Sequence, residues 1–193
     1  MIADRIFFLS AALASGLVAA TATAQTIVPT PPFNAIELEG GGHVTLRHGS
    51  VQQVRLLKGS TQFTRFIVER SQPHKLRIEA CNNDCPRNYD LEVEITTPGI
   101  DTLAVSGGGR IESGGDFPAR HQLTLAVDGG GTIDVRAMRS EGATAAVDGG
   151  GRILVNAQRE LTASINGGGK IRYWGAPRLT EAVEGGGSVE RGY

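Results

Sequence analysis

One short pattern recurs six times in this 193-residue chain: an apolar residue, a polar residue, three glycines, a polar residue and a second apolar residue. From Gly107 onward, successive triplets start 22, 20, 18 and 18 residues apart, a period typical of stacked repeats. Glycine costs about 0.5–1 kcal/mol relative to alanine in ordered structure, so glycines at fixed places indicate a structural need. That need is a positive φ or a close approach of two backbones. The triplets start at Gly40, Gly107, Gly129, Gly149, Gly167 and Gly185.

Between the triplets, apolar and polar residues alternate, as in strands that bury one face. Leu123, Leu125 and Val127 precede a triplet, and Ile133 and Val135 follow it. The next two units repeat this order with Ala143, Ala145, Val147, Ile153 and Val155, and with Leu161, Ala163, Ile165, Ile171 and Tyr173. We therefore predict a β-solenoid with glycine corners and these residues as its core. If the middle glycine Gly130 has a positive φ or faces the next rung, Gly130→Val should destabilise the protein far more than Asp128→Ala.

The first half of the chain also predicts strands, and no stretch has a helical period. Leu76 and Ile78 alternate with charged residues, as do Leu91 and Val93. We expect an all-β protein in which these N-terminal strands continue the same stack. The predicted strands span residues 35–39, 43–47, 53–57, 63–69, 75–80 and 90–96.

The N-terminal 24 residues predict a signal peptide. Arg5 precedes an apolar run from Ile6 to Ala20, and small residues lie before Gln25. This run is shorter than the roughly 20 residues that a membrane-spanning helix needs. We expect residues 1–24 to be removed, an extended proline-rich arm over 25–32, and one domain over 33–193 in the periplasm or outside the cell.

The chain has two cysteines, Cys81 and Cys85. In an oxidising compartment we expect them to form a small disulfide loop. A structural metal site would need two further ligands, and a redox motif would favour a Cys-x-x-Cys spacing.

Charge and motifs argue against several classes of function. Nineteen basic and twenty acidic residues give a net charge of −1, so nucleic acid is not an expected partner. His43, His48, His74 and His121 share no spacing suited to a metal or a catalytic dyad. The triplets lack the Gly-Lys-Ser/Thr ending of a phosphate loop. The sequence therefore predicts no catalytic residue, metal or cofactor.

The best candidate site is the pair of polar columns that flank the corners. Stacking in register would align Ser106, Asp128, Asp148, Asn166 and Glu184 on one side, and Arg110, Thr132, Arg152, Lys170 and Ser188 on the other. Such columns could bind a repetitive polar ligand or Ca²⁺, although neutralisation of one column by the other across the corner is the simpler account. Trp174 is predicted to point outward, where it either contacts a ligand or covers the edge of the last rungs. Glu181 interrupts the inward alternation, as a polar cap would.

Several segments in serial order resemble a known family. They are Phe33-Asn34-Ala35-Ile36, Leu76-Arg77-Ile78, Leu91-Glu92-Val93 and the later Val-x-Gly-Gly-Gly-x-Ile units. The chain resembles the putative auto-transporter adhesin, head GIN domain family, which implies a right-handed single-stranded β-helix of bacterial envelope or secreted proteins, without an established activity. The family's corners often read Gly-Ser-Gly-Asp, whereas here glycine replaces the serine, and residues such as Arg110 and Thr132 replace the aspartate.

Two functions remain open at this point. The first is a non-catalytic adhesin-like or structural module that binds an envelope polysaccharide or another envelope protein. The second is a polysaccharide-binding or polysaccharide-active β-helix protein. Fold by itself does not decide between them.

Overall fold

The computed structural model describes residues 25–82, 84–115 and 117–193. These residues form strands and loops, with no helix among them, so the predicted all-β class is confirmed. None of the described segments is an apolar helix of membrane-spanning length. The strands are β1 (Thr26–Val28), β2 (Ala35–Gly40), β3 (His43–His48), β4 (Gln53–Lys58), β5 (Arg65–Glu69), β6 (Lys75–Glu79), β7 (Glu92–Thr97), β8 (Thr102–Gly107), β9 (Arg110–Gly114), β10 (Arg120–Gly129), β11 (Thr132–Gly149), β12 (Arg152–Gly167), β13 (Lys170–Trp174), β14 (Arg178–Glu184) and β15 (Ser188–Arg191).

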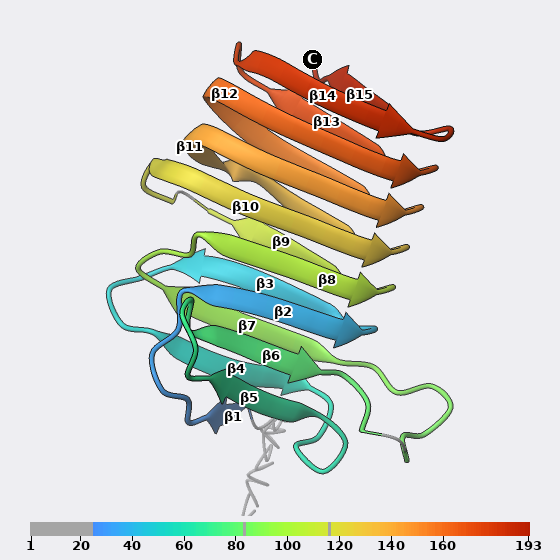
Figure 1. The fold of residues 1–193 in the computed structure, drawn as a ribbon. Helices are drawn as coiled ribbons and strands as arrows, with labels where there is room; N and C mark the ends of the chain where they lie inside the picture. Colours follow the sequence, from blue (N-terminus) through green and yellow to red (C-terminus); the bar gives the residue numbers. More distant parts are fainter. Residues whose placement is uncertain (1–24, 83, 116) are drawn as a thin grey trace, which may run out of the picture.

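The second half of the chain is a regular stack of parallel strands in two layers (Figure 1). The front layer contains β8, β10, the second halves of β11 and β12, and β14. The back layer contains β9, the first halves of β11 and β12, β13 and β15. Strands β11 and β12 belong to both layers because each one bends in its middle, where the pairing of β11 with β12 shifts register.

The N-terminal strands do not simply extend this stack in chain order. Strand β2 pairs in parallel with β8 on one side and β6 on the other, and β3 pairs likewise with β9 and β7. The rung formed by β2 and β3 therefore lies between two rungs that follow it in the sequence.

The expectation that every N-terminal strand continues the parallel stack is wrong for β4 and β5. Strand β4 pairs antiparallel with β7, and β5 pairs antiparallel with β6. The link between β5 and β6 is only residues 70–74, and a link this short permits an antiparallel hairpin but no parallel crossover.

The predicted arm contains a strand. Residues Thr26–Val28 pair antiparallel with Leu56–Val54 of β4, ahead of the first proline, Pro29, so their N–H groups remain available for the ladder. The predicted signal peptide, residues 1–24, lies outside the described part of the chain.

The core consists of columns of inward side chains that continue from rung to rung. One column runs through Leu76, Ile36, Leu103, Leu125, Ala145 and Ala163, all of which are buried. The residues predicted for the core are buried, except Tyr173, which is half-buried. The column ends at Glu181, which pairs in register with Ala163 and is exposed.

The three glycines of a triplet have different surroundings. In the triplet 129–131, Gly129 has a φ of 106°, and a Cβ there would lie 3.0 Å from the Gly107 carbonyl oxygen. A Cβ on Gly131 would overlap the Val105 side chain and lie 2.9 Å from the Gly109 oxygen. Gly130 has no positive φ and no atom within 4 Å of its Cβ position. Neither condition for a damaging Gly130→Val substitution is met, so that expectation is wrong.

Candidate functional site

The structure divides the predicted site residues between the two layers. Asp128, Asp148 and Asn166 lie in register at the ends of the front strands, with Ser106 and Glu184 extending the same column. On the back layer, Arg110, Thr132, Arg152, Lys170 and Ser188 form a second column in register.

The two columns do not neutralise each other. Arg110 pairs with Glu112 at 2.9 Å and with Asp134 at 3.6 Å, while Lys170 pairs with Glu190 at 3.0 Å. Within the described ranges, no ion pair joins the basic column to Asp128 or Asp148. The expectation of neutralisation across the corner is therefore wrong. Side chains at i and i+2 of one strand share a face and lie close together, whereas the two columns are on opposite layers.

Asp134 is a structural member of the back layer. It is 8% exposed and accepts hydrogen bonds from Arg136 Nε at 2.9 Å and Nη2 at 2.7 Å. Burial raises the pKa of Asp134, but the Arg136 bonds and the Arg110 charge outweigh burial and lower it below its ordinary value. This arrangement stabilises the layer and leaves little of the carboxylate free for a ligand.

A small basic hollow lies higher on the back layer. Arg152, Leu154, Lys170 and Arg172 line a space of about 120 Å³. Glu190 bonds to Lys170, Ser188 and Arg172, and these bonds, Lys170 first, lower its pKa to about 2. Arg152 has no carboxylate within 4.0 Å among the described residues.

The basic hollow, at 120 Å³, is smaller than two adjoining hollows that both include His121 and Gln122 in their lining and measure 280 and 490 Å³. Its cations are also largely satisfied by Glu190. It is therefore the weaker of the candidate ligand sites.

Trp174 covers the edge of the last rungs. The Arg136 guanidinium lies 5.2 Å from the centre of its ring, and Trp174 Nε1 donates to the Tyr193 carbonyl oxygen at 3.4 Å. The ring is half-buried by these contacts. Of the two interpretations of Trp174, these contacts favour the edge cover.

The loop between β6 and β7 contains Cys81 and Cys85, which the structure joins in a disulfide with Cα atoms 5.9 Å apart. No described cluster of three or more His, Cys, Asp or Glu residues has a geometry that could hold a metal ion. The disulfide joins residues four positions apart and is therefore a local clip on the loop.

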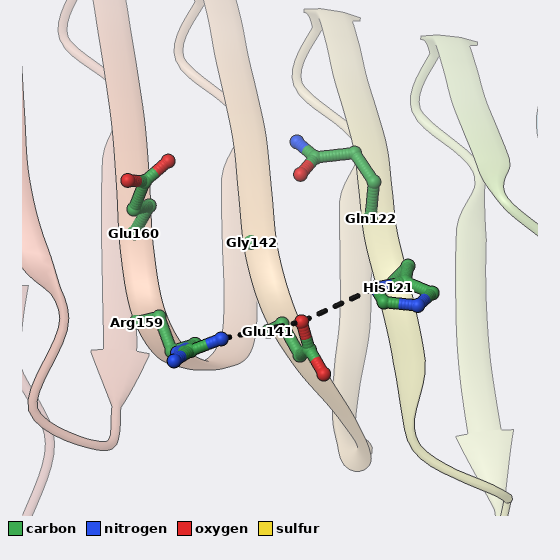
Figure 2. Close-up of a pocket in the computed structure, with 6 residues that line it drawn as sticks. All are labelled: His121, Gln122, Glu141, Gly142, Arg159 and Glu160. Carbon is green, nitrogen blue, oxygen red and sulfur yellow. Dashed lines mark hydrogen bonds and ion pairs between the residues drawn. The ribbon is translucent and has the colours of Figure 1, made fainter.

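A polar groove that sequence reasoning missed lies where the strands bend from the back layer into the front layer. Figure 2 shows its centre, in which Glu141 lies between His121 and Arg159. His121 Nδ1 is 3.1 Å from Glu141 Oε2, and Arg159 Nη1 is 3.8 Å from the same oxygen. Gln122, Gly142 and Glu160 complete the lining of this hollow of 280 Å³.

A second hollow of 490 Å³ adjoins the first and shares His121 and Gln122 with it. It continues to Arg120 and Asp101, where Arg120 Nε donates to Asp101 Oδ1 at 3.1 Å. Together the two hollows, which we call the edge groove, cross four neighbouring strands, β8, β10, β11 and β12.

Gly142 opens the centre of the edge groove. It lies in register between Gln122 and Glu160, which both carry long side chains. Its backbone has no positive φ, and a Cβ there would meet only the flexible end of Gln122. A strand glycine that the backbone does not require often marks a close approach or a bulge. Gly142 was therefore the sequence feature that could have pointed to the groove.

The edge groove offers hydrogen-bonding groups and no enclosed reaction chamber. His121 is 92% exposed and Arg159 is 76% exposed, so both side chains remain in water. Amide, carboxylate and guanidinium groups in a shallow row suit the hydroxyl groups of an extended polar ligand.

These features define a class: an all-β protein built from stacked strands, with an exposed polar groove across them. A family model described as "Putative auto-transporter adhesin, head GIN domain" matches residues 32–122 and 119–177. The chain belongs to this family, and the resemblance seen in the sequence is confirmed.

The chain is also similar to solved structures, of which the first supports the fold. A putative adhesin from Bacteroides fragilis has a TM-score of 0.55 and 15% identity, over 89% of this chain and 98% of that one. A putative adhesin from Parabacteroides merdae has a TM-score of 0.39 at 13% identity, over 88% of this chain and 96% of that one. A putative cell adhesion protein from Clostridium sporogenes has a TM-score of 0.36 at 12% identity, over 88% and 99%. A comparison with proteins of curated function found no match.

Proposed function

We propose that this chain is an exported, non-catalytic, adhesin-like module that binds an envelope polysaccharide in the edge groove. The observation that carries the proposal is the continuity of the groove across four strands. A linear ligand lying across the strands would meet a new set of polar groups at each rung, about 4.8 Å from the last. Membership of the adhesin family supports a binding role.

The same proposal includes the architecture and the location. The parallel register of the rungs supports a single-stranded β-helix with glycine triplets at its corners. The right-handed sense of this helix is taken from the family resemblance. Its parts would be a signal peptide at 1–24, an arm at 25–32 and one domain at 33–193. The Cys81–Cys85 disulfide supports an oxidising compartment, either the periplasm or the cell exterior.

A glycan array probed with residues 25–193 tests the binding role. Gly142→Gln would place a side chain in the centre of the groove without backbone strain. We expect about a tenfold weaker affinity for the captured glycan, equivalent to losing one or two hydrogen bonds of about 1 kcal/mol each. The matched control is Gly150→Gln, which adds the same side chain in open space beyond the other end of the strands.

Equal binding by the two glycine variants would exclude the edge groove as the site. A reducing-sugar assay on each captured glycan separates binding from cleavage. Release of reducing ends that is lost in the Asp128→Asn, Asp148→Asn double variant would instead support the polysaccharide-active alternative.

A further inference from the structure

The C-terminal end of the stack presents unpaired strand edges. Strand β14 pairs only with β12, and β15 pairs only with β13, within the part of the chain that the structure describes. Figure 1 shows both strands as the last rung of the stack, beside the C-terminus. Val183 is 40% exposed, and Leu179 and Val189 are only partly buried. An edge of this kind is a template for one more strand.

Glu181 sets the chemistry of this end. It occupies the inward column in which Leu125, Ala145 and Ala163 are buried in successive rungs below it. Its carboxylate therefore ends an apolar column and has no ion-pair partner among the described residues. An added strand would place a side chain directly opposite this charge.

If β14 paired antiparallel with a second copy of itself, the facing residues would be complementary, with one exception. In an antiparallel pair centred on Glu181, Arg178 would face Glu184 and Leu179 would face Val183. Only Glu181 would face an identical residue, Glu181 of the second copy, and like charges directly opposite each other destabilise a strand pair. Charge therefore opposes a second copy of this chain at the position and favours a strand with a cation there.

We infer that this end is a docking surface for an extended segment of a partner protein, which adds antiparallel to β14. The segment carries Lys or Arg opposite Glu181, and an apolar residue two positions before and two positions after that cation. Its two ends are charged and complementary to Arg178 and Glu184 of β14. Backbone hydrogen bonds supply affinity in strand addition, and the alternate side chains supply specificity. The unpaired Glu181 charge discourages addition of strands that lack the cation.

The test uses this chain as its own probe. Glu181→Lys supplies the missing cation, so an equimolar mixture of this variant with wild type should form a one-to-one dimer by sedimentation and light scattering. Each protein alone should not dimerise at this end, because it would oppose two like charges. Glu181→Ala alone should dimerise, because lower rungs already have Ala163 and Ala145 at this place.

Glu184→Lys is the matched control, because it makes the same change of charge on the same strand but on the outward face. It should give no dimer with wild type. A seven-residue peptide with the sequence of Arg178–Glu184 and lysine in place of Glu181 should bind wild type at least about tenfold more tightly than the unchanged peptide. If Glu181→Ala stays monomeric and the mixed proteins do not associate, the docking surface is excluded. Equal association by the Glu184→Lys mixture would show non-specific charge attraction and would also overturn the inference.

Discussion

Single residues in the glycine triplets differ in how much they constrain the chain. Gly129 needs a positive φ and Gly131 packs against the previous rung, whereas Gly130 faces open space. We predict that Gly129→Ala and Gly131→Ala each destabilise the protein by about 2–3 kcal/mol, through backbone strain and overpacking respectively. Gly130→Ala should change stability by no more than about 0.5 kcal/mol. Denaturant midpoints at unchanged slope measure all three.

An equal loss of stability in the three variants would mean that the triplets act through their general flexibility. A loss of stability in the Gly130→Ala variant alone would contradict the observed packing of all three positions.

Glu94 is a buried carboxylate that links two neighbouring strands. It is 7% exposed and accepts hydrogen bonds from Arg47 and Arg55. We predict that Glu94→Gln costs about 1–3 kcal/mol, less than a fully buried pair, because the arginines remain partly in water. The control is Glu92→Gln on the same strand, whose carboxylate is 45% exposed and 3.5 Å from Lys58. Urea titrations of both variants measure the difference. Equal midpoints would show that Glu94 contributes no more to stability than Glu92 does.

At the scale of elements, the disulfide stabilises one loop and not the stack. Cys81 and Cys85 enclose a short segment between β6 and β7. Closing so short a loop contributes about 2 kcal/mol in the chain-entropy model. We predict that a reductant lowers the unfolding free energy by about this amount while the β-sheet circular dichroism signal is retained. Mass spectrometry of the oxidised protein should find no free thiol, and two free thiols would contradict the pairing.

For the whole molecule, the lowered pKa values of Glu94, Asp134 and Glu190 predict acid sensitivity. Each carboxylate releases its proton more readily in the folded state than in the unfolded state. The unfolded state therefore binds more protons on acidification. This stabilisation is present above the unfolded pKa of about 4 and is lost as the pH falls, down to about 2 for Glu190.

Urea unfolding between pH 7 and pH 2.5 measures this effect. We predict a constant midpoint above about pH 5 and a progressive fall below it. The Glu94→Gln variant should lose less on acidification than wild type, since it lacks one of the titrating groups. A midpoint that stays constant to pH 2.5 would show that these ion pairs do not stabilise the fold.

Local patterns in the sequence determined the strands, the inward columns and the register of the later rungs. A period of two places Leu125 and Val127 on one face, and a glycine triplet at each repeat aligns Asp128 with Asp148. Both signals lie within a few residues of the elements they specify. Neighbouring repeats then pair in register because their patterns are the same.

Only the tertiary structure decided which distant segments pair and in which direction. An alternating strand such as Gln53–Lys58 presents the same apolar face to a parallel or an antiparallel neighbour, so its pattern does not show that β4 runs antiparallel to β7. The rung of β2 and β3 lies between later rungs for the same reason. The edge groove likewise arises where His121, Glu141 and Arg159 meet from three separate strands. Such contacts depend on the packing free energy of the whole stack, which no local pattern contains.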